Sequence, residues 1–140
     1  MEFKTINDIE IGDKASFSKT ISESDVYLFA GITGDMNPAH IDAEYIKNTP
    51  FKQRVAHGVL TTGLISAVIG MKLPGPGAIM LSTSARFTAP VFFGDTITAE
   101  VEVVEKDAAR NRLKLNAVCT NQAGKTVVTG EFGVSPYVKK

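Results

Sequence analysis

Hydrophobic and polar residues alternate along the last third of the chain. The alternation is strict over Thr96–Val103 and Leu113–Thr120, and it is looser over Lys125–Val134. A period of two is typical of β-strands that have one buried face and one wet face. Because turn signals at Asp107–Asn111 and Asn121–Gly124 separate the three segments, the pattern predicts an antiparallel meander.

The centre of the chain shows a different pattern. His57–Lys72 is apolar on all sides, and only small hydroxyl residues and glycines interrupt it. A helix of this composition is enclosed by protein on most of its surface. It is shorter than the roughly 20 residues that a membrane span needs, and Pro74–Gly77 ends it. The segment therefore predicts one long buried helix across the dry face of the sheet.

Short helices are expected in the first third of the chain. Ser22–Asp25 resembles a capping box at the start of a helix. Gly31 and Gly34 are expected to release the chain from that helix into a loop. A second short helix is expected over Ala43–Lys47, with Asp42 as its N-cap.

Lys14–Thr20 and Ala78–Phe87 complete the set of predicted strands. A length of 140 residues suits a single domain with one core, here residues 1–140. The order of elements indicates an α+β fold in which a curved antiparallel sheet wraps around one long buried helix.

Charge and cysteine content exclude several classes of function. Fifteen basic and fifteen acidic residues give a formal net charge of zero, so no patch for nucleic acid or an anionic membrane is indicated. The only cysteine, Cys119, cannot form an internal disulfide and fits a reducing compartment. Met1–Asp8 lacks the pattern of a secretion signal, so a cytoplasmic location is expected.

A carboxylate and an imidazole lie five positions apart in the segment that follows Gly34. Neighbours on one face of a helix are three or four residues apart, and in an extended strand these two side chains would be roughly 16 Å apart. Only a bend brings Asp35 and His40 to one small ligand. Pro38 supplies it by pushing Asn37 out of the helical region. The segment therefore predicts an acid-base pair.

A series of motifs spans nearly the whole chain. It consists of Tyr27 and Phe29, Gly34-Asp35-x-Asn37-Pro38-x-His40, His57-Gly58, Arg86-Phe87-x-x-Pro90-Val91 and Gly94-Asp95-Thr96. With this series the chain resembles the MaoC-like, R-specific enoyl-CoA hydratase family. The resemblance implies a single MaoC-like domain with the hot dog fold.

The resemblance also implies the reversible addition of water to trans-2-enoyl-CoA, which gives (R)-3-hydroxyacyl-CoA. The aspartate and histidine that hold the water in that family correspond to Asp35 and His40. The glycine whose backbone N–H contacts the thioester oxygen corresponds to Gly58. Hot dog proteins are usually dimers that join their sheets edge to edge, so a homodimer is expected. Further candidates for substrate contacts are Asn37, His57, Gly63 and Arg86.

The residue types support this chemistry independently. Hydration of an enoyl thioester needs a base for the water and a donor for the thioester oxygen. An imidazole titrates near neutral pH, so His40 suits the base, and Asp35 can accept the other hydrogen of the water. The free N–H groups at the start of the central helix favour negative charge, and Gly58 leaves a thioester room to approach.

Structural roles compete for several of these residues. Asp35 can close an Asx-turn. His57 can be a structural residue at the helix start and not a second base. Tyr27 and Phe29 can line an acyl tunnel or pack a helix. Cys119 follows the apolar register of its strand and is expected in the core.

No recognised metal-ligand spacing, nucleophile elbow, P-loop or dinucleotide fingerprint occurs, so no metal and no bound cofactor is expected. CoA would enter as part of the substrate, and candidate cations for its phosphates are Lys52, Arg54, Lys72 and Arg86.

Three other functions compete: an (R)-3-hydroxyacyl-[acyl-carrier-protein] dehydratase, a hot dog acyl-CoA thioesterase and a non-catalytic acyl-CoA binding module. Gly63, if it faces the acyl group, would leave room for longer chains.

Overall fold

The computed structural model describes residues 1–140 and contains one sheet, one long helix and several short helices. The helices are the 3₁₀ turn η1 (Ile6–Asp8), α1 (Glu23–Thr33), α2 (Pro38–Ile41), α3 (Ala43–Ile46) and α4 (Gly58–Met71). The strands are β1 (Lys14–Thr20), β2 (Ile79–Phe87), β3 (Thr96–Asp107), β4 (Arg112–Thr120) and β5 (Thr126–Ser135). Every strand that the hydrophobic pattern predicts is confirmed, and only β3 extends well past its expected end.

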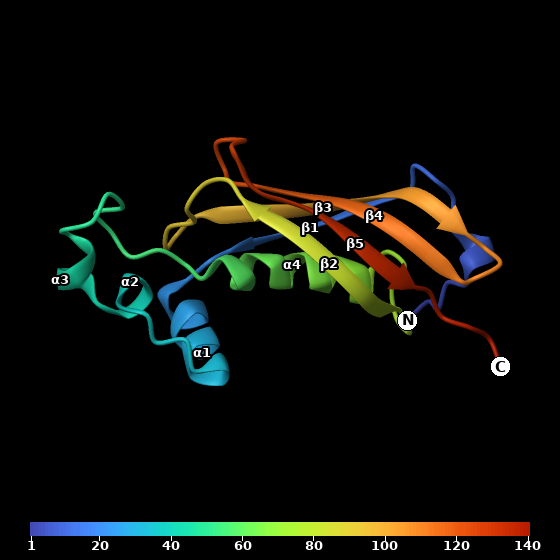
Figure 1. Ribbon diagram of the computed structural model, residues 1–140, viewed down its shortest axis with the longest axis horizontal. Helices are drawn as coiled ribbons and strands as arrows, with labels where there is room; N and C mark the ends of the chain where they lie inside the picture. Colours follow the sequence, from blue (N-terminus) through green and yellow to red (C-terminus); the bar gives the residue numbers. More distant parts are fainter.

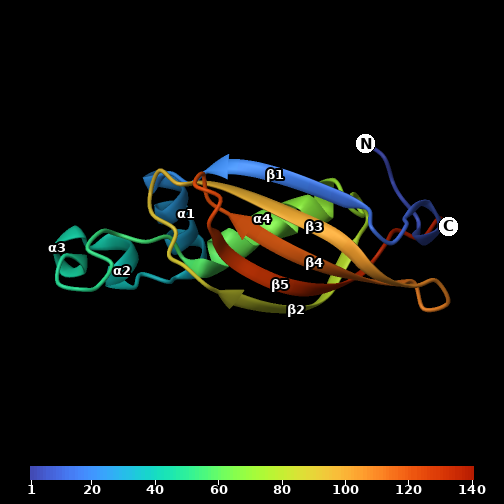
Figure 2. The same ribbon diagram turned by 90° about the horizontal axis from the view of Figure 1, so that it is seen from above.

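All strands belong to one antiparallel sheet in the order β1-β3-β4-β5-β2. β3, β4 and β5 form the predicted meander, with positive φ angles at Asn111 and Gly124 in the connecting turns. Figure 2 shows β1 and β2 at the two edges of the sheet. Each of these two strands therefore has one side with no partner strand.

Helix α4 lies across one face of the sheet, and the sheet curves around it (Figure 1). Ile65 and Val68 on the inward side of α4 are fully buried, as are Val101 of β3 and Leu115 of β4. Burying one such side chain stabilises the fold by roughly 1.5–3 kcal/mol. The α+β arrangement expected from the sequence is confirmed.

The expectation that α4 is a buried helix is confirmed, but one stripe of it is exposed in the single chain. Val59 and Met71 are 61% and 64% exposed, and Gly63 and Ser66 between them are also exposed. The strands of the sheet supply the main contacts of α4, and a sheet covers only one side of a helix. The segment is therefore more apolar than the burial within one chain requires.

The start of α1 confirms the predicted capping box. The Asp25 N–H donates to Ser22 Oγ at 3.1 Å, and the Ser22 N–H donates to Asp25 Oδ2 at 2.9 Å. The hydrogen bond from the Ser22 N–H is the main cause that lowers the pKa of the Asp25 carboxyl group. Gly31 lies inside α1, contrary to the prediction, and Gly34 alone ends the helix in a left-handed conformation with a φ of 84°.

Two one-turn helices follow α1. The Asp42 carboxylate caps α3 as predicted, by accepting the N–H groups of Glu44 and Tyr45. Helix α2 was not predicted. Asn37 caps it, and Pro38 occupies its first position, where the missing N–H of proline costs nothing.

The short helices α1, α2 and α3 gather at the end of the sheet where α4 begins, and both chain termini lie at the opposite end (Figures 1 and 2). α2 and α3 project beyond the sheet in both views. None of the helices has the length and hydropathy needed to cross a membrane.

Candidate functional site

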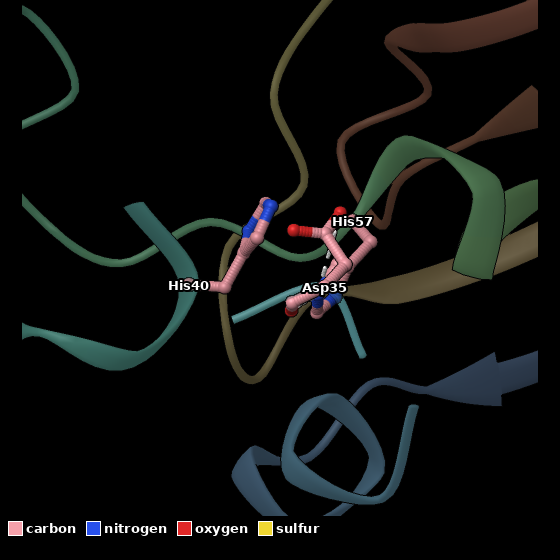
Figure 3. A group of neighbouring side chains, drawn as sticks. All are labelled: Asp35, His40 and His57. Carbon is pink, nitrogen blue, oxygen red and sulfur yellow. Dashed lines mark hydrogen bonds and ion pairs between the residues drawn. The ribbon is translucent and has the colours of Figure 1, made fainter. Parts of the chain in front are cut away.

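Asp35, His40 and His57 come from three segments and meet beside the start of α4 (Figure 3). Asp35 follows α1, His40 lies in α2, and His57 immediately precedes α4. One oxygen of Asp35 and one nitrogen of each histidine all lie within 4.8 Å of one another. The structure thus brings the two residues of the predicted acid-base pair to one place.

The local backbone places Asp35 in this group. The left-handed Gly34 turns the chain sharply after α1. The Asn37 N–H then donates to Asp35 Oδ1 at 3.2 Å, which is the Asx-turn that the sequence also allowed. The turn engages only one carboxylate oxygen, and the side chain is 52% exposed. Oδ2 is therefore accessible to a ligand.

A distant backbone segment orients the ring of His40. Its Nδ1 lies 2.6 Å from the carbonyl oxygen of Val55, and the Val55 N–H donates to the carbonyl of Ala39 at 3.1 Å. Because a carbonyl can only accept, the hydrogen is assigned to Nδ1 and the lone pair to Nε2. Nε2 is thus the basic atom. Sequence reasoning missed Val55, since a backbone carbonyl has no residue-type signature.

His57 is enclosed by protein, with 2% of its surface exposed. Its Nε2 lies 2.9 Å from the Asp35 carbonyl oxygen and 4.0 Å from Asp35 Oδ2. Its ring stacks on His40 with centroids 3.7 Å apart and contacts Phe29 at 4.6 Å. These contacts favour a structural role for His57 over that of a second base.

The first turn of α4 offers free backbone donors. Gly58 and Val59 are the first residues of the helix, so their N–H groups have no acceptor within it, and no carbonyl elsewhere in the chain accepts from them. Phe87 of β2 packs directly on Gly58, where an added Cβ would lie 2.6 Å from the ring. Packing within the chain therefore requires glycine at this position. The close approach of Phe87 is a further feature that sequence reasoning missed.

Two cavities meet at Gly58 and Val59. The smaller measures about 270 Å³, and its other lining residues are Phe29, Thr33, Asp35, His40 and His57. The larger measures about 500 Å³ and is mostly apolar, with Phe51, Val55, Ala56, Thr61, Phe87, Thr88, Ala89, Pro90, Val91 and Val128 as its other lining residues. A ligand with its polar centre at Gly58 can reach the acid-base pair on one side and the apolar cavity on the other.

The remaining candidates for substrate contacts line neither cavity. The Asn37 side chain accepts an N–H in the first turn of α2. Gly63 lies on the exposed side of α4, with open space around its Cβ position. Arg86 lies in a polar groove on the face of the sheet opposite α4, beside Asn116. Within one chain, the structure does not bring Gly63 and Arg86 to the acid-base pair, and Asn37 contacts Asp35 only through its backbone N–H.

Two of the cations suggested for the CoA phosphates can be placed clearly. Arg54 donates to Glu23 at 2.9 Å and to the Tyr27 hydroxyl, and it lies 4.8 Å from the Phe93 ring centre. Partial burial alone would lower the pKa of Arg54, but the hydrogen bonds with Glu23 and Tyr27 raise it. Arg54 therefore joins α1 to the segment before α4. Lys72 lies at the other end of α4.

Asp35, His40 and His57 also carry the donor atoms of a metal site. The two rings, however, stack with their planes only 28° apart, so their in-plane lone pairs do not converge on one point. Each ring also uses one nitrogen on a backbone carbonyl. The arrangement fits an acid-base pair better than a metal centre.

Comparison with known proteins places the chain in a family. The model of the MaoC like domain matches residues 7–125. An (R)-specific enoyl-CoA hydratase of Rhodospirillum rubrum is 52% identical over 127 residues, which cover 91% of this chain and 88% of that protein. A 3-hydroxybutyryl-CoA dehydratase of Methylorubrum extorquens is 48% identical over 121 residues, which cover 86% of this chain and 76% of that protein.

A solved structure supports the same assignment. The R-hydratase of Pseudomonas aeruginosa in the unliganded form superposes with a TM-score of 0.91 and 45% sequence identity, over 96% of this chain and 86% of that chain. At this coverage the similarity includes the sheet, α4 and the segments that carry the site. The chain has the hot dog fold and belongs to the MaoC-like domain family.

Proposed function

We propose that this protein is an (R)-specific enoyl-CoA hydratase, which adds water reversibly to trans-2-enoyl-CoA and yields (R)-3-hydroxyacyl-CoA. The observation that carries the proposal is the meeting of Asp35, His40 and the free N–H of Gly58 at the junction of the two cavities. The names of the two relatives agree with it, because dehydration of a 3-hydroxyacyl-CoA is the reverse of hydration.

In this proposal the base is Nε2 of His40. It takes one proton from a water molecule held between Nε2 and Asp35 Oδ2, while the water oxygen bonds to C3 of the enoyl group. The hydrogen bond from His40 Nδ1 to the Val55 carbonyl supports the required tautomer. The hydrogen bond from the Val55 N–H to the carbonyl of Ala39, the residue before His40, holds Val55 in place. Such proton transfer typically contributes about 10² to 10⁴ in rate.

The Gly58 N–H is the donor for the thioester oxygen. As the C3–O bond forms, the electron pair of the double bond moves toward the thioester, and negative charge develops on its oxygen. The N-terminus of α4 favours that charge, and one such donor is worth about 3 kcal/mol in the transition state. The proton on His40 then passes to C2, so one water molecule is added and the imidazole is regenerated.

The larger cavity suits the acyl chain. Its walls are mostly hydrocarbon, and it begins at Gly58, where the thioester would rest. Phe51 and Phe87 lie on its walls and would limit the length of the chain. Gly63 lies outside the cavity. Its predicted effect on acyl chain length therefore requires that the acyl group of a second subunit lies near α4.

The protein in this proposal is a homodimer joined along β2. Three observations support it: the free side of β2, the exposure of Ile79 and Leu81 on that strand, which are 60% and 50% exposed, and the apolar side of α4 that the chain leaves uncovered. The other edge strand is protected against pairing, since β1 carries Lys14, Lys19 and several hydroxyl residues. A second copy would extend the sheet and cover both exposed surfaces.

Hydration of crotonyl-CoA by the purified protein, with chiral analysis of the product, tests the proposal. We expect loss of the enoyl absorbance and formation of the R product. Release of free thiol, detected with a thiol-reactive dye, would instead indicate a thioesterase. Faster turnover of the acyl carrier protein thioester than of the CoA thioester would indicate the dehydratase. Tight acyl-CoA binding without turnover would indicate a binding module.

A cytoplasmic location is part of the proposal. The free thiol of Cys119, buried in the core, supports it because such thiols persist in reducing compartments. Fractionation of cells that express the tagged protein tests it, and recovery in a secreted fraction would contradict it.

A further inference from the structure

His57 is unusual among the buried residues. Only His57 and Thr61 are polar in the set of buried side chains. Burying an imidazole costs free energy unless it is hydrogen-bonded, and Nδ1 of His57 has no partner in the chain. Packing alone would favour an apolar ring here. The contacts of Nε2 explain why a polar ring stands at position 57.

The hydrogen bond of Nε2 has a defined direction. Its partner is the carbonyl oxygen of Asp35, which can only accept, so His57 donates. The other hydrogen bonds of Asp35 join it to Thr33 and Asn37, each two positions away in the same loop. The bond from His57 is thus the only hydrogen bond that ties Asp35 to a distant segment of the chain.

The ring of His57 also restrains His40. A single hydrogen bond to the Val55 carbonyl holds one nitrogen of His40 but permits the ring to tilt about that contact. The stacked face of His57, with ring centroids 3.7 Å apart, blocks this tilt from one side. His57 is also bonded directly to Gly58, so one residue contacts the acid, the base and the oxyanion donor.

We infer that His57 is a positioning residue, which holds Asp35 through its Nε2–H and His40 through its ring face. The inference rests on the proposed hydratase function and deepens it. In this role His57 acts through Asp35 and His40 and transfers no proton. Its contribution is the geometry of the pair, and a misplacement of about 1 Å can cost roughly a hundredfold in rate.

Two substitutions separate the two contacts. His57→Phe keeps a ring face for His40 and removes the donor to Asp35. His57→Gln removes the ring face and places an amide nitrogen close to the position of Nε2. We expect His57→Phe to lower kcat for crotonyl-CoA about 10- to 100-fold with KM changed less than threefold. We expect His57→Gln to have a kcat at least about fivefold above that of His57→Phe.

Hydrogen exchange gives a readout besides activity. The backbone amides of residues 34–37 should exchange faster in His57→Phe than in the wild type, and His57→Gln should restore slow exchange. Val68→Ala, a core substitution at the other end of α4, serves as the control for lost stability and should keep the wild-type kcat. If His57→Phe does not fold, His57→Leu takes its place with the same expected order.

The possible failures are distinguishable. If the wild type does not hydrate crotonyl-CoA, the proposed function fails. If the wild type is active and His57→Phe has the wild-type kcat, only the positioning role is overturned. Losses matched by Val68→Ala would also overturn it, because the lower kcat would then reflect lost stability and not the contacts of His57 with Asp35 and His40.

Discussion

Backbone groups orient the reactive side chains of this site. The Val55 carbonyl fixes the tautomer of His40, and the Asn37 N–H holds one oxygen of Asp35. The Gly58 N–H has no acceptor in the chain and is the proposed donor for the thioester oxygen. Backbone groups in folded segments are already ordered, so they orient the acid-base pair with little further loss of conformational entropy on ligand binding.

At this residue scale, Asp35→Asn and His40→Gln test the proposed roles directly. Each substitution removes one acid-base group at nearly constant size, so we expect kcat for crotonyl-CoA to fall at least about a hundredfold while circular dichroism and Tm stay close to wild type. Asp42→Asn is the matched control, since Asp42 caps α3 and lines neither cavity. A near-wild-type rate for either variant would remove that residue from the mechanism.

Cys119 allows a second prediction at the residue scale. It is fully buried on β4, as expected from its apolar register, and burial raises its pKa to about 11. The raised pKa favours the neutral thiol, so little thiolate exists at pH 8. We expect iodoacetamide to leave the native protein unlabelled at pH 8 and to label it in urea, as measured by intact mass. Rapid labelling of the native protein would contradict the buried placement.

At the scale of elements, α4 serves both the core and the site. Its inward side packs on the sheet, while its first turn presents the free N–H groups. The end of β2 meets this first turn through the contact of Phe87 with Gly58. The position of the Gly58 N–H, the proposed oxyanion donor, is therefore coupled to the packing of an edge strand.

A double-mutant cycle measures this coupling. Gly58→Ala should lower the free energy of unfolding, because the new Cβ would lie 2.6 Å from the Phe87 ring. Phe87→Ala removes the clash, so the double variant should lose less than the sum of the single losses, with a coupling of about 0.5–3 kcal/mol in urea unfolding. Gly31→Ala, in open space on α1, is the control and should not destabilise. Additive losses would show that the contact is not formed.

At the scale of the whole molecule, the chain leaves apolar surface exposed on β2 and on α4. The two edges of the sheet differ: β1 carries lysines and hydroxyl residues, while β2 begins with Ile79, Met80 and Leu81. Charged residues on an edge strand prevent pairing with another sheet, and an apolar edge invites it. This contrast supports β2 as the pairing edge of the proposed dimer.

Light scattering after size exclusion tests the dimer. We expect a mass of about twice the 15.0 kDa of the chain for the wild type, because the proposed dimer pairs β2 with β2 of a second copy. The double variant Ile79→Lys, Leu81→Lys should shift the mass toward that of the monomer, because two charges would be buried at the proposed pairing edge. Val118→Lys, on the outer face of the central strand β4, should remain dimeric. A dimer that tolerates the β2 charges would place the interface elsewhere.

Local patterns were sufficient for the regular elements. The period-two strands and the capping box of α1 depend on neighbouring residues, and both are confirmed. Helix α2 was missed because one turn is too short for a periodic signal. Gly31 was misjudged, since a glycine inside a helix and one that ends a helix look alike in sequence. The exposed stripe of α4 was missed because apolar composition does not show which side of a helix remains uncovered.

The sequence by itself determined the α+β class, the long central helix and the candidate pair Asp35 and His40, because these follow from periodicity, from side-chain chemistry and from the bend at Pro38. Only the tertiary structure decided the partners of that pair: the Val55 carbonyl against His40 and the buried His57 against both. The physical reason is distance along the chain. Contacts between segments 15 and 22 residues apart depend on how the elements pack, and no local pattern encodes that packing.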